Sequence, residues 1–313
     1  MNGVTILSVG TSLPKKCVTN DELSKTVDTN DEWIRSRSGI GARYICDENE
    51  TTYTMAIEAG RRAIEKAGIN KEDIAMVAIT TSSSDYLFPM NASMVQAGLG
   101  LNEEIMSFDL TAACSGLIYA IELARGYLTM NNKKYALIIG SEHLTRITDY
   151  TDRSTCILFG DAGGAIIVGL NEGAAYASKQ WTRGNFEVLW CAGASGNGQK
   201  IHMNGKEVFK FAVDAMDQGI KEVLEAGGQT LDDVKYIICH QANLRIIDHV
   251  KKRYKGHEHK FFSNIEKYAN TSTASIPIVL EELFDKGELN KGDKIVLVGF
   301  GAGLVWGSAL IEL

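Results

Sequence analysis

Two pairs of similar segments recur along the sequence at nearly the same spacing. Residues 63–80 align without gaps with residues 223–240, at an offset of 160, and both predict a helix, a glycine stop, an acidic turn and an apolar strand. Residues 111–140 align with residues 270–299, and both predict a loop, a helix, a polar turn and a buried strand. A repeat of this length is the size of a domain, so we predict two similar halves that pack against each other.

The predicted strands indicate the fold class. They are short and continuously apolar, as in MVAIT, YALIIG, AIIVG, KYIIC and KIVLVG, which is typical of strands covered by helices on both faces. We therefore predict a layered α/β architecture. Chance similarity is the alternative to a duplication, but two pairs of segments in register argue against it. No low-complexity linker divides the chain, so we expect one compact body with halves at residues 1–170 and 171–313.

The composition excludes several classes of protein. The 313 residues carry a formal net charge of −7, which argues against a nucleic-acid-binding surface. No apolar run reaches the roughly 18 residues of a membrane span, and the N-terminal sequence is unlike a signal peptide. We therefore expect a cytoplasmic protein without a membrane partner. The six cysteines have neither paired nor metal-like spacing, so we expect free thiols and no metal site.

Cys114 lies between a predicted strand, IMSFDL, and a predicted helix. The helix is indicated by apolar residues at helical spacing, namely Leu117, Ile121, Ala124 and Leu128. At a helix N-terminus the positive end of the dipole lowers the pKa of a thiol, and backbone N–H groups can stabilise an oxyanion. Cys114 is thus a candidate nucleophile. The alternative is a small buried apolar side chain.

His240 and Asn270 are the candidate partners of this thiol. His240 follows the predicted strand VKYIIC, and ligands bind at the carboxyl ends of strands in open α/β sheets. Asn270 lies in the loop of the second half that corresponds to the Cys114 loop of the first, so the duplication is expected to bring all three residues to one interface. The alternatives are a structural histidine and a turn or cap asparagine. The remaining histidines are expected to lie in solvent: His143, His202, His249, His257 and His259.

The glycine-rich segment 299–307, GFGAGLVWG, resembles a nucleotide-binding loop only superficially. That motif needs a helix after the glycines, and here the sequence predicts another strand. We expect a tight glycine turn that exposes backbone N–H groups, one of which could be a second oxyanion donor. The residues alone therefore predict an enzyme with a cysteine nucleophile and with histidine and asparagine partners.

At these residues the sequence also resembles a known family over the whole chain. Seven segments resemble, in order, the motifs of β-ketoacyl-acyl carrier protein synthase III: TNDEWIRSRSGI, AACSG, TDRSTCILFGDAGGA, IHMNGKEVFKFAV, HQANLRII, NTSTASIP and GFGAGLVWGSA. The resemblance implies a thiolase-like α-β-α-β-α fold. It also implies an acyltransferase that condenses a short acyl-CoA with malonyl-acyl carrier protein (malonyl-ACP), with loss of CO₂, to give a 3-oxoacyl-ACP and initiate fatty acid synthesis.

The resemblance assigns roles to the candidate residues. It implies that Cys114 carries the acyl group, that His240 and Asn270 promote decarboxylation, and that the N–H groups of Cys114 and Ala302 form the oxyanion hole. It implies no metal and no cofactor other than the CoA thioester substrate. Relatives that elongate fatty acids use a second histidine, whereas this chain has Asn270. Degradative thiolases need a second cysteine in the final glycine-rich loop, and here that loop has none.

The resemblance further implies residues that bind the substrates. Contacts to the adenine and phosphates of CoA are implied for Trp33, Arg37 and Arg153, with Arg35 as an addition to the motif. A tunnel for the pantetheine arm is implied along Met203, Gly205, Phe209, Ala242 and Asn243. Core packing is the alternative for Met203 and Phe209. Phe300 is implied beside the decarboxylation site, while residues 174–198 match the family least well and leave the acyl preference open.

Two partners are implied as well. In this family the active site is completed across a two-fold dimer, and DYLFPMNAS resembles the segment that places Phe88 at the partner's acyl pocket. For the anionic carrier protein, the helix LRIIDHVKKRYK is expected to bury Ile246, Ile247 and Val250 and to expose a cationic face. The carrier-protein contacts are then Lys210, Arg245, Lys252 and Arg253, with Lys251 and Lys255 nearby. A solvated charge run is the alternative.

Two other functions stay open. One is a related acyltransferase of secondary metabolism that uses the same three residues on another acceptor, such as an amine or alcohol. The other is a non-catalytic module that binds acyl-CoA or carrier protein. The presence of Cys114, His240 and Asn270 argues against the binding module. Decarboxylation of a malonyl thioester would distinguish the condensing enzyme from the secondary-metabolism acyltransferase, because acyl transfer to a heteroatom does not need this step.

Overall fold

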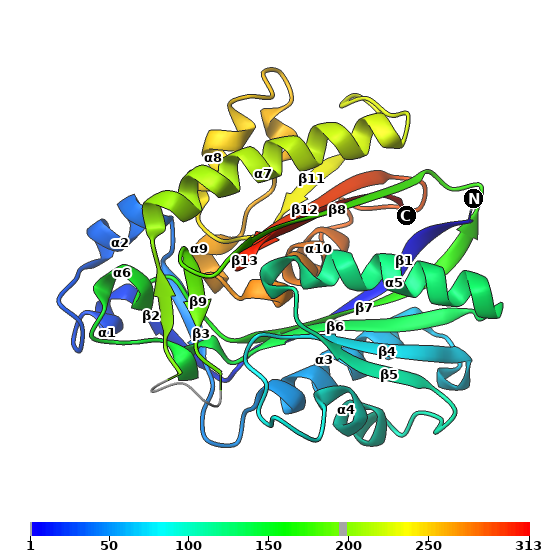
Figure 1. Cartoon of the computed structure of the whole chain (residues 1–313), viewed down its shortest axis with the longest axis horizontal. Helices are drawn as coiled ribbons and strands as arrows, with labels where there is room; N and C mark the ends of the chain where they lie inside the picture. The colour runs from blue at the N-terminus through cyan, green and yellow to red at the C-terminus, as the bar shows by residue number, and fades with distance from the viewer. Residues whose placement is uncertain (1, 194–198) are drawn as a thin grey trace.

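Two stacked β-sheets form the body of the protein in the computed structural model, which describes residues 2–193 and 199–313 (Figure 1). The first sheet has the order β1-β7-β6-β4-β5, with β1 (Asn2–Ser12), β7 (Ala162–Glu172), β6 (Tyr135–Glu142), β4 (Ile74–Thr80) and β5 (Met106–Leu110). The second sheet has the order β11-β12-β13-β8, with β11 (Tyr236–Cys239), β12 (Lys294–Gly301), β13 (Gly303–Glu312) and β8 (Tyr176–Asn185).

The second sheet repeats four strands of the first. Strands β4 and β6 are parallel, as are β11 and β12. The β6–β7 and β7–β1 pairs are antiparallel, as are the β12–β13 and β13–β8 pairs. This matching topology confirms the predicted duplication. The division after residue 170 stays a prediction; β7 continues to Glu172, and β8 begins at Tyr176.

The two halves also match in local backbone geometry. Two helices, α5 (Gly116–Asn131) and α10 (Ser275–Asp285), each follow a 3-10 turn, η2 (Ala113–Ser115) and η5 (Ser272–Ala274). Ala113 and Ser272 align with each other, and both have a left-handed backbone, with φ of 45° and 49°. A non-glycine residue pays a steric cost for this conformation, so its recurrence at equivalent positions indicates a shared constraint on the two turns.

Five layers are stacked in the order helix, sheet, helix, sheet, helix (Figure 1). Helices α5 and α10 lie between the sheets, and their buried apolar side chains share one core with the inner faces of both sheets. Helices α3 (Thr52–Ala67) and α4 (Asn91–Leu99) cover the outer face of the first sheet. Helices α7 (Gly205–Ala226) and α8 (Leu244–Lys251) cover the outer face of the second. The α-β-α-β-α prediction is confirmed.

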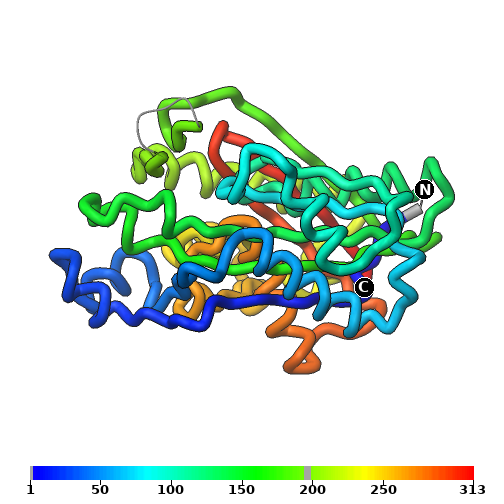
Figure 2. The backbone as a smooth tube through the Cα atoms, turned by 90° about the horizontal axis from the view of Figure 1, so that it is seen from below, coloured from blue at the N-terminus to red at the C-terminus, as the bar shows by residue number. Residues whose placement is uncertain are grey.

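A smaller group of elements, which we call the cap, lies at the end of the molecule away from both termini (Figures 1 and 2). The cap comprises α1 (Asn20–Leu23), α2 (Asp31–Ser38), α6 (Arg153–Cys156), η3 (Leu144–Ile147), β2 (Lys16–Thr19), β3 (Ala42–Ile45), β9 (Leu189–Cys191) and β10 (Ile201–Met203). Apolar side chains of these elements form a core of their own.

The other short elements are η1 (Lys71–Asp73), η4 (Glu258–Lys260) and α9 (Ile265–Tyr268). None of the helices in the described part of the chain is long and apolar enough to span a membrane.

Candidate active site

A cavity of about 610 Å³ reaches from the protein surface to the junction of the two halves. Cys114 of the first half lines it together with His240 and Asn270 of the second. His240 and Asn270 are buried, and Cys114 is half-buried. The structure therefore places the three predicted residues around one cavity, although they come from three separate segments of the sequence.

Cys114 lies in the 3-10 turn η2, directly after β5 and just before α5. The expected lowering of its pKa is wrong. Burial raises the pKa of this thiol to about 12; a hydrogen bond with Ser272 acts in the opposite direction, and the negative charge of Glu142 adds to the increase. The thiol is therefore protonated near neutral pH and has to lose its proton before it can act as a nucleophile.

The glycine turn between β12 and β13 lies against the backbone of Cys114. A Cβ atom on Gly301 would be 2.7 Å from the backbone nitrogen of Cys114 and 2.6 Å from the Cβ of Ala113, so only glycine allows this approach. Ala302, the next residue of the turn, also lines the cavity. The strand predicted after this turn is β13, and the turn brings the backbone of Ala302 to the same cavity as Cys114.

His240 directly follows β11 at its carboxyl end and is held on two sides. Its backbone N–H donates to Val298 O at 2.8 Å, and its Nδ1 lies 2.8 Å from Ser275 Oγ. The Phe300 ring packs edge-on against the imidazole, with 5.5 Å between the ring centres. Burial lowers the pKa of His240 to about 3, so the ring is neutral at physiological pH.

Asn270 is oriented by the turn that follows it. Its Oδ1 accepts the backbone N–H of Ser272 at 2.9 Å, and its backbone N–H donates to Leu158 O at 2.9 Å. The side-chain Nδ2 has no hydrogen-bond partner within residues 2–193 and 199–313. This arrangement fixes the amide oxygen and leaves the NH₂ group as a donor for a ligand.

A buried carboxylate, Glu142, lies behind these residues at the end of β6. Its Oε1 accepts the hydroxyls of Ser272 and Thr273, at 2.8 and 3.2 Å. Its Oε2 accepts the Thr81 and Ser83 hydroxyls and the Ser82 N–H, at 3.1, 2.5 and 3.0 Å. Glu142 therefore joins loops of both halves beneath the cavity. The sequence contained no signal for this role, because its donors are scattered hydroxyls.

Most, but not all, of the residues predicted to contact CoA and the acyl group line the cavity. Seven of the eight residues implied for CoA line the cavity: Trp33, Arg37, Met203, Gly205, Phe209, Ala242 and Asn243. The eighth, Arg153, does not line it, but its guanidinium carbon lies 4.6 Å from the Trp33 ring centre. Phe300 lines the cavity, whereas Phe88 does not. The additional Arg35 pairs with Asp31 and Glu266, at 2.8 and 2.7 Å, and is not part of the wall.

One of the four residues predicted to contact the carrier protein lines the cavity, and the other three do not. Arg245 lines the cavity, and its guanidinium carbon lies 5.7 Å from the Phe209 ring centre. Lys210 and Lys252 are exposed and are not part of the wall. Arg253 pairs with Asp217 and Asp214, at 3.0 and 3.3 Å, so neighbouring carboxylates compensate its charge. The buried face of α8 is the predicted one, formed by Ile246, Ile247 and Val250.

The tract 174–198 supplies wall residues that the sequence did not reveal. Leu189, Trp190 and Cys191 of β9 line the cavity, and Trp190 stacks on His202 with 4.1 Å between ring centres. Residues 194–198 of this tract lie outside the described residues. The wall is thus formed in part by the segment that matches the family least well.

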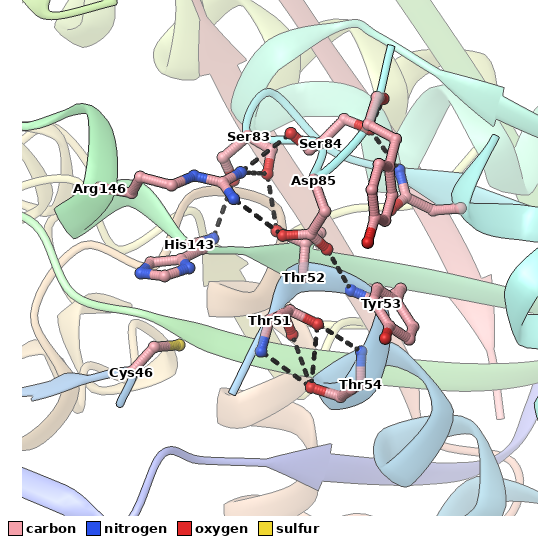
Figure 3. A network of polar contacts seen from close by, with 12 residues as sticks. Cys46, Thr51, Thr52, Tyr53, Thr54, Ser83, Ser84, Asp85, His143 and Arg146 are labelled. Carbon is pink, nitrogen blue, oxygen red and sulfur yellow. Dashed lines mark hydrogen bonds and ion pairs between the residues drawn. The ribbon is translucent and has the colours of Figure 1, made fainter. Parts of the chain in front are cut away.

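His143 corrects the expectation that the remaining histidines lie in solvent. Its side chain is half-buried beside Cys46 (Figure 3), burial lowers its pKa, and its Nε2 lies 3.9 Å from Asp161 Oδ2. The ligating atoms of Cys46, His143 and Asp161 lie within 4.8 Å of one another, as a metal site would require. The Asp161 carboxylate, however, already accepts the backbone N–H groups of Thr145 and Cys46, both at 2.9 Å. We therefore assign no metal to this group.

Comparison with known proteins identifies similar chains. Family models described as 3-oxoacyl-[acyl-carrier-protein (ACP)] synthase III and as its C terminal match residues 108–184 and 224–313. The β-ketoacyl-[acyl-carrier-protein] synthase III of Acholeplasma laidlawii is 43% identical over 314 residues, which cover 99% of this chain and 98% of the relative.

Solved structures agree with these matches. The 3-oxoacyl-[acyl-carrier-protein] synthase III of Aquifex aeolicus superposes with a TM-score of 0.94 at 39% identity, covering 99% of this chain and 100% of the other. The priming β-ketosynthase of the R1128 polyketide pathway superposes with the same TM-score at 31% identity, covering 99% and 96%. The thiolase-like fold expected from the sequence is thereby confirmed.

Proposed function

This chain belongs to the 3-oxoacyl-[acyl-carrier-protein] synthase III family of condensing acyltransferases that initiate fatty acid synthesis, and we propose that Cys114, His240 and Asn270 carry out its reaction. One observation carries this proposal: a thiol, a neutral imidazole and a free amide donor line one cavity. The test is incubation with acetyl-CoA and malonyl-ACP, followed by mass spectrometry of the carrier protein for a 3-oxoacyl product. Unchanged malonyl-ACP would contradict the proposal.

Acyl transfer is the first half-reaction. The Cys114 thiolate attacks the acyl-CoA thioester, and the N–H groups of Cys114 and Ala302 stabilise the tetrahedral oxyanion. The acyl group remains on the sulfur, and CoA leaves as the thiol with the proton that Cys114 has lost. The approach of the Gly301 turn to Cys114 supports this role for Ala302.

Decarboxylation and condensation form the second half-reaction. The Nε2–H group of His240 and the side-chain NH₂ group of Asn270 donate hydrogen bonds to the thioester oxygen of malonyl-ACP. When CO₂ leaves, negative charge develops on this oxygen, so these donors bind the transition state more tightly than the ground state. The resulting carbanion attacks the acyl carbon on Cys114 and forms the new carbon–carbon bond. The carbon–sulfur bond then breaks, so 3-oxoacyl-ACP is released and Cys114 leaves as a thiolate that takes up a proton from solvent. A neutral imidazole suits this role, because its N–H group donates a hydrogen bond although the ring carries no charge.

CoA is expected to enter past Trp33. The guanidinium groups of Arg153 and Arg37 lie 4.6 and 5.9 Å from the centre of its ring. A flat aromatic face beside two positive charges suits a purine base with phosphate groups. The apolar wall beyond these residues suits the pantetheine arm and a short acyl chain.

The carrier protein is expected to dock on a cationic surface beside the cavity, formed by Lys210, Arg245 and Lys252. These residues have no ion pair in the described part of the chain, and all are exposed. Two net-negative proteins repel each other unless the contact surface is locally positive. Arg253 contributes less than the sequence suggested, because Asp214 and Asp217 neutralise it.

Charge reversal tests this surface. We expect Lys252→Glu and Arg245→Glu each to raise the KM for malonyl-ACP by about fivefold at low salt and much less at high salt, because salt screens exposed charges. Acylation of Cys114 by acetyl-CoA should change little. The matched control is Lys133→Glu, which makes the same change of charge at an exposed site after α5. Equal effects of the three variants would contradict a docking site at Lys252 and Arg245.

The segment that carries Phe88 has a fixed base and an exposed apolar tip. Arg146 donates to Asp85 Oδ1 at 2.9 Å and to the backbone oxygen of Ser83 at 2.7 Å, and Tyr53 N–H donates to the Asp85 carboxylate at 2.9 Å (Figure 3). At the tip, Leu87 and Phe88 are each 82% exposed. Large exposed apolar side chains on an ordered loop suit a protein contact, which supports the proposed homodimer.

Light scattering should therefore give the mass of a dimer. We expect Phe88→Ala to remain dimeric and to accept longer or branched acyl-CoA primers, because it enlarges the partner's acyl pocket. Phe186→Ala is the matched control, since Phe186 is 81% exposed outside this segment, and its primer range should equal that of the wild type. A fully active monomer would contradict the proposal.

The secondary-metabolism alternative keeps one observation in its favour, the likeness to the R1128 priming β-ketosynthase. A panel of acyl-CoA primers would distinguish an enzyme of fatty acid synthesis from one of secondary metabolism by primer preference. The mass of the adduct on the protein identifies the primer. The cytoplasmic location expected from the sequence stays a prediction.

A further inference from the structure

The imidazole of His240 makes one side-chain hydrogen bond in the described structure, to a serine that begins the central helix α10. Nδ1 of His240 lies 2.8 Å from Ser275 Oγ, and both residues are buried, with exposures of 1% and 2%. Nε2 has no partner within the described residues and remains for a ligand in the cavity that His240 lines. The direction of the bond at Nδ1 therefore decides what Nε2 offers to a substrate.

The surroundings of Ser275 fix that direction. Its Oγ also accepts the backbone N–H of Gln241 at 3.3 Å, and an N–H group can only donate. If Nδ1 carried the proton, Oγ would accept two hydrogen bonds, and its own hydroxyl proton would have no acceptor among the described residues. If the Ser275 hydroxyl donates to Nδ1, then Nδ1, the hydroxyl and the N–H of Gln241 are all paired. Buried polar groups are paired in folded proteins, so the second arrangement is favoured.

We propose that Ser275 is a positioning residue, which donates its hydroxyl proton to Nδ1 of His240 and thereby keeps the single proton of the neutral ring on Nε2. This inference rests on the proposed role of His240 in decarboxylation. The thioester oxygen of malonyl-ACP can then accept the Nε2 proton as negative charge develops on it. With the other tautomer, Nε2 would present a lone pair to that oxygen and would repel it.

The same turn orients both donors of the second half-reaction. Ser272 N–H holds the oxygen of the Asn270 amide, and three residues later the Ser275 hydroxyl holds Nδ1 of His240. The turn is itself fixed by Glu142, which accepts the hydroxyl of Ser272 at 2.8 Å. Asn270 and His240 are thus aimed into the cavity by a single short segment, residues 270–275.

Nitrogen NMR of the ¹⁵N-histidine-labelled protein tests the inference without any assay of activity. The His240 signals are assigned by their loss in His240→Ala. In the wild type we expect a protonated Nε2 and an unprotonated Nδ1, and in Ser275→Ala a partial shift of the proton to Nδ1. A wild-type ring protonated on Nδ1 would overturn the inference.

The half-reactions give a second test. We expect Ser275→Ala to slow release of CO₂ from malonyl-ACP on the order of tenfold, as for loss of one hydrogen bond. Acylation of Cys114 by acetyl-CoA should stay at the wild-type rate, and Ser275→Thr, which keeps the hydroxyl, should restore decarboxylation. Ser308→Ala is the control, because it removes another buried hydroxyl, 2.8 Å from Gly219 O and outside the cavity wall.

Each outcome separates the inference from the proposal beneath it. Equal losses in both half-reactions of Ser275→Ala would show a packing role and overturn the inference. If His240→Ala loses decarboxylation but Ser275→Ala keeps it, the inference fails and the role of His240 stands. If His240→Ala decarboxylates at the wild-type rate, the proposed role of His240 itself fails.

Discussion

Replacing Cys114 with alanine is expected to abolish the acyl adduct that the wild type forms with acetyl-CoA. The reaction needs a sulfur beside an oxyanion site. Cys114 carries such a sulfur, and its own backbone N–H lies close to Gly301. Intact-mass measurement should show one added acetyl group on the wild type and none on Cys114→Ala. Because the effect is the loss of a bond-forming atom, we expect no residual adduct.

The cavity offers a matched control for this experiment. Cys191 is a second cysteine of the wall and is exposed, so it is the thiol best placed to be acylated by mistake. Cys191→Ala should acquire the same single acetyl group as the wild type. An adduct on Cys114→Ala, or its loss in Cys191→Ala, would remove Cys114 from the role of nucleophile.

The second large effect concerns the two half-reactions. His240→Ala and Asn270→Ala should still accept an acetyl group on Cys114 but should lose decarboxylation of malonyl-ACP by roughly 10²–10³-fold, the loss expected for deletion of an oxyanion donor. Release of CO₂ and intact mass measure the two steps separately. His249→Ala is the control, because His249 is an exposed histidine of α8 outside the cavity wall.

The pH dependence of the wild type adds to this test. Burial lowers the pKa of His240 to about 3, so the ring is neutral both at pH 5 and at pH 8. The decarboxylation rate should therefore show no transition near the ordinary histidine pKa of about 6.5. A rate that follows an ionisation there, and that loses this transition in His240→Ala, would mean that a charged imidazole takes part.

Much of the fold could be predicted because the duplication is visible in local sequence patterns. The aligned glycines Gly68 and Gly228, which follow helices α3 and α7, have the same φ of 61°, and the predicted apolar runs form the strands of two matching sheets. The placement of Cys114 and Asn270 in equivalent loops followed from the same alignment. Long, regular patterns of this kind depend on backbone geometry and burial, which a single sequence displays directly.

What the sequence concealed depends on contacts between distant residues. The pKa of Cys114 could not be predicted, because burial in the folded protein outweighs the helix start that the local pattern indicates. The hydroxyl donors around Glu142 come from two loops about 190 residues apart in sequence, and no local pattern joins them. His143 was placed in solvent for the same reason, because its neighbour Asp161 comes from a different segment of the sequence, directly before β7.

The matched turns at Ala113 and Ser272 bear on the internal symmetry of the protein. The residue after the left-handed position is Cys114 in the first copy and Thr273 in the second. The hydroxyl of Thr273 donates to Glu142 at 3.2 Å, so the residue of the second copy that aligns with the proposed nucleophile makes a structural contact instead. The first copy, in turn, has Thr111 where the second has Asn270. The thiol and the amide therefore occupy different positions of the repeat, and two identical copies would carry each of them twice or not at all. At these positions the chain has each group once, in opposite copies, so the proposed site depends on the divergence of the two copies.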